Sequence, residues 1–301
     1  MRDDHIFIMA PPRSGTLMLS RALGRYPETY LITEHKQKKL VIPEEKNPTP
    51  DREFWQQAFG LSRPLEEVEF DINAFARLNE LWTANAGGRR LIIKNPNNVV
   101  RAWEIRRAFP NAPFVWLLRN PWAVIQSMLG GKQAGQKTPM FLGARKVLKH
   151  EDPVLRAAVS WAYAIEIMRE VGSAADITTR YEDLVAKPQQ ELDRIARHLS
   201  LAGGKDAQKV PELRGEAFWI TRYLLRRSPE RERIIQTIAP FASELGYPAT
   251  PPGFPGDDRI QAMHYLMRWI ARNKRPPYGF PRLERMRSTV RTTARSYIKG
   301  P

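Results

Sequence analysis

The sequence of 301 residues contains no cysteine, so neither disulfide bonds nor thiolate chemistry is available to this chain. No stretch approaches the roughly 20 consecutive apolar residues that a membrane-spanning helix needs. The apolar run at residues 6–9 is also too short for the core of a signal peptide, so we expect a cytoplasmic protein. The 5 histidines are scattered without any His-x-x-x-His pair, and no metal is therefore expected.

Acidic residues are scarce beside basic ones, since 48 Lys and Arg against 32 Asp and Glu give a net charge of +16. Residues 251–301 contain 11 Lys and Arg but 3 Asp and Glu, and they open with Pro-Pro-Gly-Phe-Pro-Gly, a composition typical of a linker. We therefore predict a folded domain over residues 1–250 and a basic, helical C-terminal extension over residues 251–301. Such an extension either contacts an anionic surface, such as a membrane to which the protein would be peripheral, or is simply solvated.

What the sequence does contain is a strand, a tight turn and a helix near its N-terminus. Residues 6–9 form an apolar run typical of a buried strand, Arg13 and Gly15 lie in the turn, and apolar residues at helical spacing continue to Leu23. This architecture aims backbone N–H groups and a helix N-terminus at an anion such as phosphate. The turn lacks the Gly-x-x-x-x-Gly-Lys-Ser/Thr pattern, so a nucleoside triphosphate is not the first ligand to expect.

Apolar strands alternate with helices through the rest of the folded domain. Further strands are predicted at residues 91–93, 114–118 and 176–181, and helices at residues 99–109, 121–129, 154–171, 191–199 and 231–245. This alternation is typical of an α/β fold with a parallel sheet that is covered on both faces. Ligands bind at the carboxyl ends of the strands in such sheets, so polar residues at those ends are candidate site residues.

All four predicted strands are followed by polar side chains that are candidates for a site. Arg13 lies in the turn after the first strand, and Lys94, Arg119 and Tyr181 end the other three. A single arginine at a strand end is more often a salt-bridge partner. Three cations at one edge of a parallel sheet instead predict a pocket for a ligand with more than one anionic group. Ser127, on the helix after Arg119, has a hydroxyl able to share an anion with that arginine.

Four segments together resemble sulfotransferases that use 3′-phosphoadenosine 5′-phosphosulfate (PAPS). Residues 11–16 resemble the 5′-phosphosulfate loop of that family, and residues 119–127 resemble its 3′-phosphate motif. Residues 94–96 are similar to its Lys-x-Pro strand end, and residues 180–185 to its Arg-Tyr-Glu-Asp-Leu segment. The Arg-Ser-Gly-Thr loop is most similar to the protein-tyrosine and bacterial branches. The resemblance spans residues 5 to about 200 and implies a P-loop-like, three-layer fold with about five parallel strands flanked by helices.

The resemblance assigns roles in moving a sulfuryl group from PAPS to a hydroxyl acceptor, with release of 3′,5′-ADP. The side chain of Arg13 and the backbone N–H groups that follow it would hold the 5′-phosphosulfate. These N–H groups belong to Ser14, Gly15, Thr16 and Leu17. Arg119 and Ser127 would hold the 3′-phosphate, and Tyr181 would lie near the nucleotide. Lys94 would contact the bridging oxygen or the sulfuryl group.

The chemistry of sulfuryl transfer accounts for these residue types. Negative charge grows on the leaving oxygen during in-line transfer, so cations aimed there stabilise the transition state without a metal. The acceptor hydroxyl also needs a base. The candidates are Glu34 and His35, and we favour Glu34 because a Glu stands seven residues after the equivalent of Pro27 in the protein-tyrosine branch. The alternative is that Glu34 only pairs with a neighbouring lysine.

Two other functions remain open. A kinase or NTPase of similar topology would need a Walker lysine and a Mg²⁺-binding Asp at a strand end, and neither is visible. A basic nucleic-acid-binding protein would fit the charge, but it predicts exposed cations rather than cations at strand ends, so nucleic acid is not the expected partner. The expected partner is a small-molecule, glycan or lipid acceptor, bound by residues 35–85 and 130–150. Aromatic residues in that region, such as Phe75 and Trp82, are predicted to be core more often than acceptor contacts.

Overall fold

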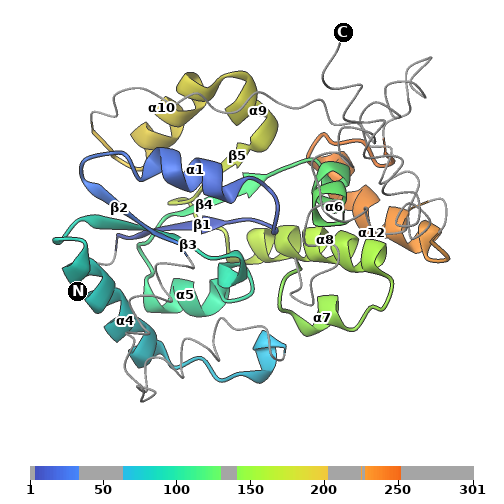
Figure 1. Cartoon of the computed structure of the whole chain (residues 1–301), viewed down its shortest axis with the longest axis horizontal. Helices are drawn as coiled ribbons and strands as arrows, with labels where there is room; N and C mark the ends of the chain where they lie inside the picture. Colours follow the sequence, from blue (N-terminus) through green and yellow to red (C-terminus); the bar gives the residue numbers. More distant parts are fainter. Residues whose placement is uncertain (1–3, 34–63, 130–140, 203–224, 226–227, 252–301) are drawn as a thin grey trace, which may run out of the picture. The chain divides into compact units, whose positions relative to one another are not determined.

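The structure, a computed structural model, describes residues 4–33, 64–129, 141–202, 225 and 228–251. Its centre is a five-stranded sheet with the order β2-β3-β1-β4-β5 (Figure 1). The strands are β1 (Ile6–Met9), β2 (Thr29–Thr33), β3 (Arg90–Lys94), β4 (Phe114–Leu118) and β5 (Ile177–Arg180). Every pairing between them is parallel. The predicted α/β fold with about five parallel strands is confirmed.

Helices cover both faces of this sheet. The helical elements are α1 (Thr16–Leu23), η1 (Leu65–Glu67), α4 (Ile72–Asn85), η2 (Pro96–Asn98), α5 (Ala102–Ala108), α6 (Pro121–Leu129), α7 (Arg145–Leu148), α8 (Pro153–Val171), α9 (Tyr181–Ala186), α10 (Pro188–His198) and α12 (Arg231–Glu244). Helices α1, α9 and α10 lie on one face, and α4 and α5 lie on the other (Figure 1). Among the described residues, no helix is long and apolar enough to cross a membrane.

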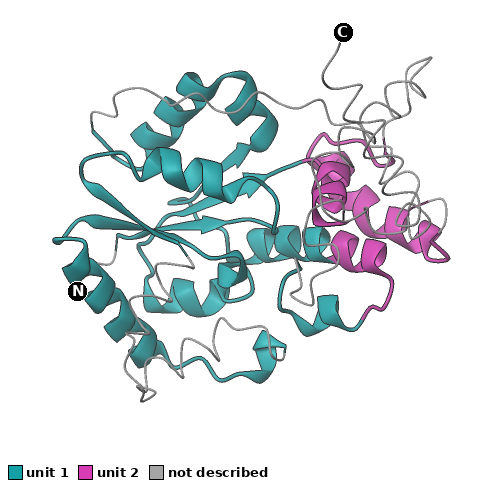
Figure 2. Cartoon of the chain, in the orientation of Figure 1, with its two compact units in different colours: residues 1–119, 141–149, 160–213 teal, residues 120–140, 150–159, 214–301 magenta. Residues whose placement is uncertain are grey.

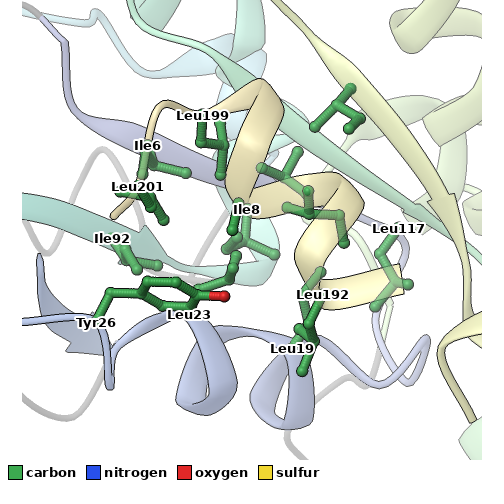
Figure 3. Close-up of a cluster of buried hydrophobic side chains, with 14 of the residues drawn as sticks. Ile6, Ile8, Leu19, Leu23, Tyr26, Ile92, Leu117, Leu192, Leu199 and Leu201 are labelled. Carbon is green, nitrogen blue, oxygen red and sulfur yellow. The ribbon is translucent and has the colours of Figure 1, made fainter. Parts of the chain in front are cut away.

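The alternation of side chains along β1 builds a separate core on each face of the sheet. Ile6 and Ile8 belong to a buried cluster that includes Leu19 of α1 and Leu192 of α10 (Figure 3). Phe7 points to the opposite face, because successive side chains of a strand alternate. The central strand is therefore apolar throughout and is held from both sides, which fixes the position of the turn that follows it.

An aromatic cluster forms the core of the second face. The ring centroid of Phe7 lies 6.4 Å from that of Phe75, 5.8 Å from that of Phe109 and 5.9 Å from that of Phe114. Phe75 is 1% exposed and Trp82 is 0% exposed, so both are core residues as predicted. These rings attach α4 and α5 to the sheet through offset and edge contacts.

The chain divides into two compact units (Figure 2). Unit 1 comprises residues 1–119, 141–149 and 160–213 and contains the whole sheet; unit 2 comprises residues 120–140, 150–159 and 214–301. Within unit 2, Asp152 accepts hydrogen bonds from two backbone N–H groups at the start of α8 and one from Ser228 Oγ at 2.8 Å. The predicted extension, apart from its first residue, lies outside the described residues, so its boundary stays a prediction.

Local sequence explains where the elements differ from expectation. The helix predicted from residue 99 begins at Ala102, because Asn95 accepts a hydrogen bond from the N–H of Asn97 at 3.0 Å and starts the short turn η2 first. The last strand ends at Arg180, and Tyr181 begins α9. Strand β2 and helix α4 were not predicted.

At the amino ends of β4 and β5, the carboxylate of Asp176 accepts hydrogen bonds from several donors. Its Oδ1 accepts hydrogen bonds from Arg106 Nη2 at 2.6 Å and from the N–H of Phe114 at 2.9 Å. Its Oδ2 accepts hydrogen bonds from the N–H of Ser173 at 3.0 Å and from the Trp116 indole at 3.4 Å. The carboxylate therefore ties two strands to the helix that precedes β4.

We expect Asp176→Ala to lower the free energy of unfolding by about 3 kcal/mol, because it leaves the guanidinium of Arg106 and two backbone donors without their acceptor. Urea denaturation measures this loss. The control is Glu67→Ala, which removes an exposed ion pair with Arg145 and should cost less than about 1 kcal/mol. Equal losses in the two variants would contradict the structural role of Asp176.

Candidate active site

The candidate site lies at the edge of the sheet where the parallel strands end. Lys94 is in register with Ile8 of β1 on one side and with Thr33 of β2 on the other. Arg119 directly follows β4, which pairs with β1, and Arg180 at the end of β5 pairs with Leu118. The structure thus brings the predicted strand-end residues of unit 1 to one edge of its sheet, as expected for parallel strands.

The turn between β1 and α1 has the shape of an anion-binding loop. Arg13 has a φ of 71° and Gly15 a φ of 97°, both in the left-handed region. The N–H of Ser14 donates to the carbonyl of Pro11 at 3.3 Å and closes the turn. Helix α1 begins at Thr16, and the N–H groups of Met18 and Leu19 donate to the carbonyl of Gly15 at 3.0 and 3.3 Å. The N–H groups of Thr16 and Leu17 precede these bonds and are the ones available to an anion.

The hydroxyl of Ser14 gives a second indication of a ligand at this loop. Ser14 is 0% exposed, and its Oγ makes no hydrogen bond to any described part of the chain. Buried hydroxyl groups almost always have a partner, so such an atom calls for a specific explanation. An anion bound by the loop would supply the missing acceptor.

Arg119 is fixed by contacts to three different elements. Its Nη1 donates to the carbonyl of Arg13 at 2.9 Å, which links the end of β4 to the loop. Its guanidinium carbon lies 4.1 Å from the centroid of the Tyr181 ring. Its backbone carbonyl accepts a hydrogen bond from the indole of Trp161 on α8 at 3.0 Å. The guanidinium is therefore held beside the loop rather than extended into solvent.

The ring of Tyr181 also lies against the loop. A Cβ atom placed on Gly15 would stand 2.6 Å from Cδ2 and 2.7 Å from Cε2 of Tyr181. Real Cβ atoms do not approach other atoms this closely, so only glycine fits at this position. The positive φ of Gly15 imposes the same requirement independently.

Two guanidinium groups near each other create a local excess of positive charge. Arg13 is solvent-exposed as a whole residue, yet the desolvation of its guanidinium by surrounding protein atoms and the charge of Arg119 both lower its pKa. Both effects penalise the cation, and a bound anion would relieve the repulsion. The electrostatics of the loop therefore favour a negatively charged ligand.

Lys94 is 7% exposed, which is rare for a lysine and means that other residues surround its side chain. The η2 turn that follows it contains two asparagines that were not predicted to matter. Asn98 Nδ2 donates to the carbonyl of Ile93 at 3.3 Å, and Asn97 Oδ1 accepts from the N–H of Gly143 at 3.3 Å. These side chains fix the end of β3, and the run Asn-Pro-Asn-Asn after Lys94 was the available signal, since asparagine commonly bonds nearby backbone in turns.

The roles of some predicted residues stay predictions. Glu34 and His35 lie outside the described residues, although Thr33, the residue before Glu34, pairs with Lys94. Ser127 lies half-buried on α6 in unit 2, and its role stays a prediction. Leu17, in the first turn of α1, is 42% exposed, so this position offers its backbone and an apolar surface but no hydroxyl.

Metal ligands do not gather in the described ranges, where no group of three or more His, Cys, Asp or Glu side chains is placed to hold a metal ion. The cations and the loop support the binding of anionic groups by backbone N–H groups and by Arg13, Lys94 and Arg119.

The fold and this edge define a class: P-loop-like α/β proteins with a loop and cationic side chains at the carboxyl ends of their strands. A family model described as the sulfotransferase family matches residues 5–203. The chain belongs to the sulfotransferase family. The match begins one residue before β1 and extends past α10, so it includes every strand of the sheet and the whole loop.

Individual relatives agree with this assignment. The chain is 23% identical over 287 residues to protein-tyrosine sulfotransferase 2 of Gallus gallus, which covers 92% of this chain and 70% of that protein. It is 29% identical over 119 residues to the omega-hydroxy-beta-dihydromenaquinone-9 sulfotransferase of Mycobacterium tuberculosis, which covers 38% of this chain and 29% of that one. A crystal structure of a sulfotransferase from Mycobacterium avium shares the fold at 14% identity, with a TM-score of 0.50 over 82% of this chain and 78% of that chain.

Proposed function

We propose that this sulfotransferase takes its sulfuryl group from PAPS, transfers it to a hydroxyl group and releases 3′,5′-ADP. The observation that carries the proposal is the link between two separate cationic elements, since Arg119 donates to the carbonyl of Arg13 in the anion loop. A loop for one anion and an arginine beside it suit a nucleotide with anionic groups at both its 5′ and 3′ positions. ATP carries no 3′-phosphate, and PAPS does.

Each residue of the loop has a distinct task in this proposal. The N–H groups of the loop up to Thr16 and Leu17, together with Arg13, hold the 5′-phosphosulfate, and Ser14 Oγ donates to one of its oxygens. Arg119 holds the 3′-phosphate, with Ser127 as its partner in that contact. Lys94 faces the oxygen on which negative charge grows as the sulfuryl group leaves, and its low exposure strengthens that electrostatic interaction.

The base for the acceptor hydroxyl is Glu34 in this proposal, with His35 as the second candidate. The support from the structure is the register of the preceding residue, because Thr33 pairs with Lys94 at the end of β2. Glu34 follows Thr33 directly in the sequence, which supports its choice as the base. A general base and an electrostatic group are both needed on the acceptor side of an in-line transfer.

The acceptor class is proposed from the relatives. One relative is named for protein tyrosine and another for an omega-hydroxylated menaquinone, and both of those acceptors carry a hydroxyl group. We propose a hydroxyl acceptor for this chain as well, with small-molecule, glycan and lipid alcohols as the compounds to examine. The test is a transfer assay with ³⁵S-labelled PAPS against a panel of tyrosine peptides, sugars and lipid alcohols. Labelled product with at least one hydroxyl acceptor supports the proposal, whereas transfer to amines alone would overturn it.

Replacing Arg119 by alanine should weaken the binding of 3′,5′-ADP by about 10-fold to 100-fold, the loss typical of a charged hydrogen bond. The affinity for 5′-AMP should fall much less, because that nucleotide lacks the 3′-phosphate. Isothermal titration calorimetry measures both affinities. Equal losses for the two nucleotides would refute the role proposed for Arg119.

A further inference from the structure

One aromatic ring contacts both cationic elements of the site. The ring of Tyr181 lies where a Cβ atom on Gly15 would collide with it, and the guanidinium carbon of Arg119 lies 4.1 Å from its centroid. Gly15 belongs to the loop after β1, and Arg119 follows β4. Tyr181, which begins α9 directly after β5, therefore connects two segments that are more than 100 residues apart in the sequence.

The ring is itself held firmly. Tyr181 packs against the buried cluster that contains Leu19 of α1 and Leu184 of α9. Its backbone is fixed by the start of α9, directly after Arg180 at the end of β5. A ring supported by the core in this way can fix the positions of more flexible neighbours, namely the backbone of Gly15 and the long side chain of Arg119.

The two neighbours need such support. The guanidinium of Arg119 donates to the carbonyl of Arg13, a residue with a φ of 71° that non-glycine residues rarely adopt. Unusual backbone conformations persist only where the surroundings enforce them. The Tyr181 ring lies against both the guanidinium that donates to this carbonyl and the Cβ position of Gly15 in the same loop.

We propose that Tyr181 is a positioning residue of the nucleotide site, which acts through Arg119 and Gly15 by means of its aromatic ring. The inference rests on the proposed function and deepens it, because it makes the 5′-anion loop and the 3′-phosphate arginine depend on one side chain. A flat ring is required, since the interaction with a guanidinium comes from the face of an aromatic system.

Calorimetry with 3′,5′-ADP on the full chain tests this inference. Tyr181→Leu should weaken binding by about 10-fold, the size of a desolvated cation–π contact. Tyr181→Phe should restore most of that affinity, because it keeps the ring. The matched control is Tyr30→Leu, which removes the ring under Arg89 (4.7 Å from the guanidinium carbon to the centroid) near the amino end of β2. Equal effects of Tyr181→Leu and Tyr30→Leu, or a Tyr181→Phe variant as weak as Tyr181→Leu, would overturn it.

A double-mutant cycle separates positioning from direct nucleotide contact. If Tyr181 acts largely through Arg119, Tyr181→Leu should cost much less in an Arg119→Ala background than in the wild type. Additive losses would show that the ring acts independently of the arginine and would overturn the inference. Thermal unfolding of each variant without nucleotide identifies any loss that comes from a damaged fold.

A readout without nucleotide keeps this test separate from that of the proposed function. The Nε–H signal of Arg119 in an NMR spectrum, assigned by its disappearance in Arg119→Lys, should be displaced by the ring current of Tyr181. Tyr181→Leu should remove the displacement and Tyr181→Phe should keep it. An unchanged signal in Tyr181→Leu would overturn the inference, whereas a wild-type protein that fails to bind 3′,5′-ADP would overturn the proposed donor and leave this result standing.

Discussion

Gly15→Ala is expected to weaken the binding of 3′,5′-ADP by about 100-fold. Two independent costs add at this position. A left-handed conformation costs a non-glycine residue about 1–2 kcal/mol, and the new methyl group would stand 2.6 Å from the Tyr181 ring, an overlap whose relief costs about 1–3 kcal/mol. The loop cannot keep its conformation under both the backbone strain and the overlap, so the N–H groups at the start of α1 no longer point at the anion. Calorimetry with 3′,5′-ADP measures the loss.

Gly88→Ala is the matched control for this experiment. Gly88 also has a positive φ, 74°, but a Cβ atom there would meet no atom within 4 Å. Gly88→Ala therefore introduces a left-handed non-glycine residue without a steric overlap and away from the loop. It should bind 3′,5′-ADP as the wild type does. Adding Tyr181→Leu to Gly15→Ala should not restore full affinity, because the backbone strain at residue 15 remains. A Gly15→Ala variant with wild-type affinity would contradict the proposed role of the loop.

The second large effect is expected on catalysis. Lys94→Met should lower kcat for sulfuryl transfer by about 10²-fold to 10³-fold, the usual loss when a group that stabilises developing charge is removed. Methionine is close to lysine in size and flexibility and removes the charge, so the buried position stays filled. The affinity for 3′,5′-ADP should fall far less than kcat, because this product no longer carries the sulfuryl group.

Single-turnover transfer of the label from ³⁵S-PAPS, read against the Kd of 3′,5′-ADP, distinguishes the two effects of Lys94→Met. The control is Lys187→Met, since Lys187 is an exposed lysine directly after α9 and its replacement should leave both quantities unchanged. If Lys94→Met lowered only the affinity for 3′,5′-ADP while kcat stayed intact, Lys94 would be a binding residue and its catalytic role would be wrong.

The sequence predicted the part of the fold that rests on continuous apolar runs. Strands β1 and β4 are uninterrupted apolar segments, and β3 has the apolar run Leu91–Ile93 between Arg90 and Lys94. Their pairings confirm the parallel sheet inferred from them. Strand β2 (Thr29–Thr33), with the sequence Thr-Tyr-Leu-Ile-Thr, was missed although its apolar run is as long as that of β3. Its pairing with the full length of β3 decides its conformation, and that is a tertiary effect.

For the candidate site, the sequence predicted which residues lie at the carboxyl edge of the sheet. Parallel strands bring their carboxyl ends together whatever the details, so Arg13, Lys94 and Arg119 could be grouped from order and pattern alone. The contacts among them could not. The ring of Tyr181 meets Gly15 only because β5 and α9 pack where they do, and nothing local in either segment encodes that distance.

We propose that the site recognises a nucleotide with anions at both the 5′ and 3′ positions. The most direct test of this proposal is calorimetric titration of the full chain with 3′,5′-ADP, 5′-AMP and ATP under identical conditions. We expect 3′,5′-ADP to bind at least about 10-fold tighter than either of the others, because it alone carries the 3′-phosphate proposed to contact Arg119. No binding of 3′,5′-ADP at concentrations near a millimolar, or equal or tighter binding of ATP, would contradict it.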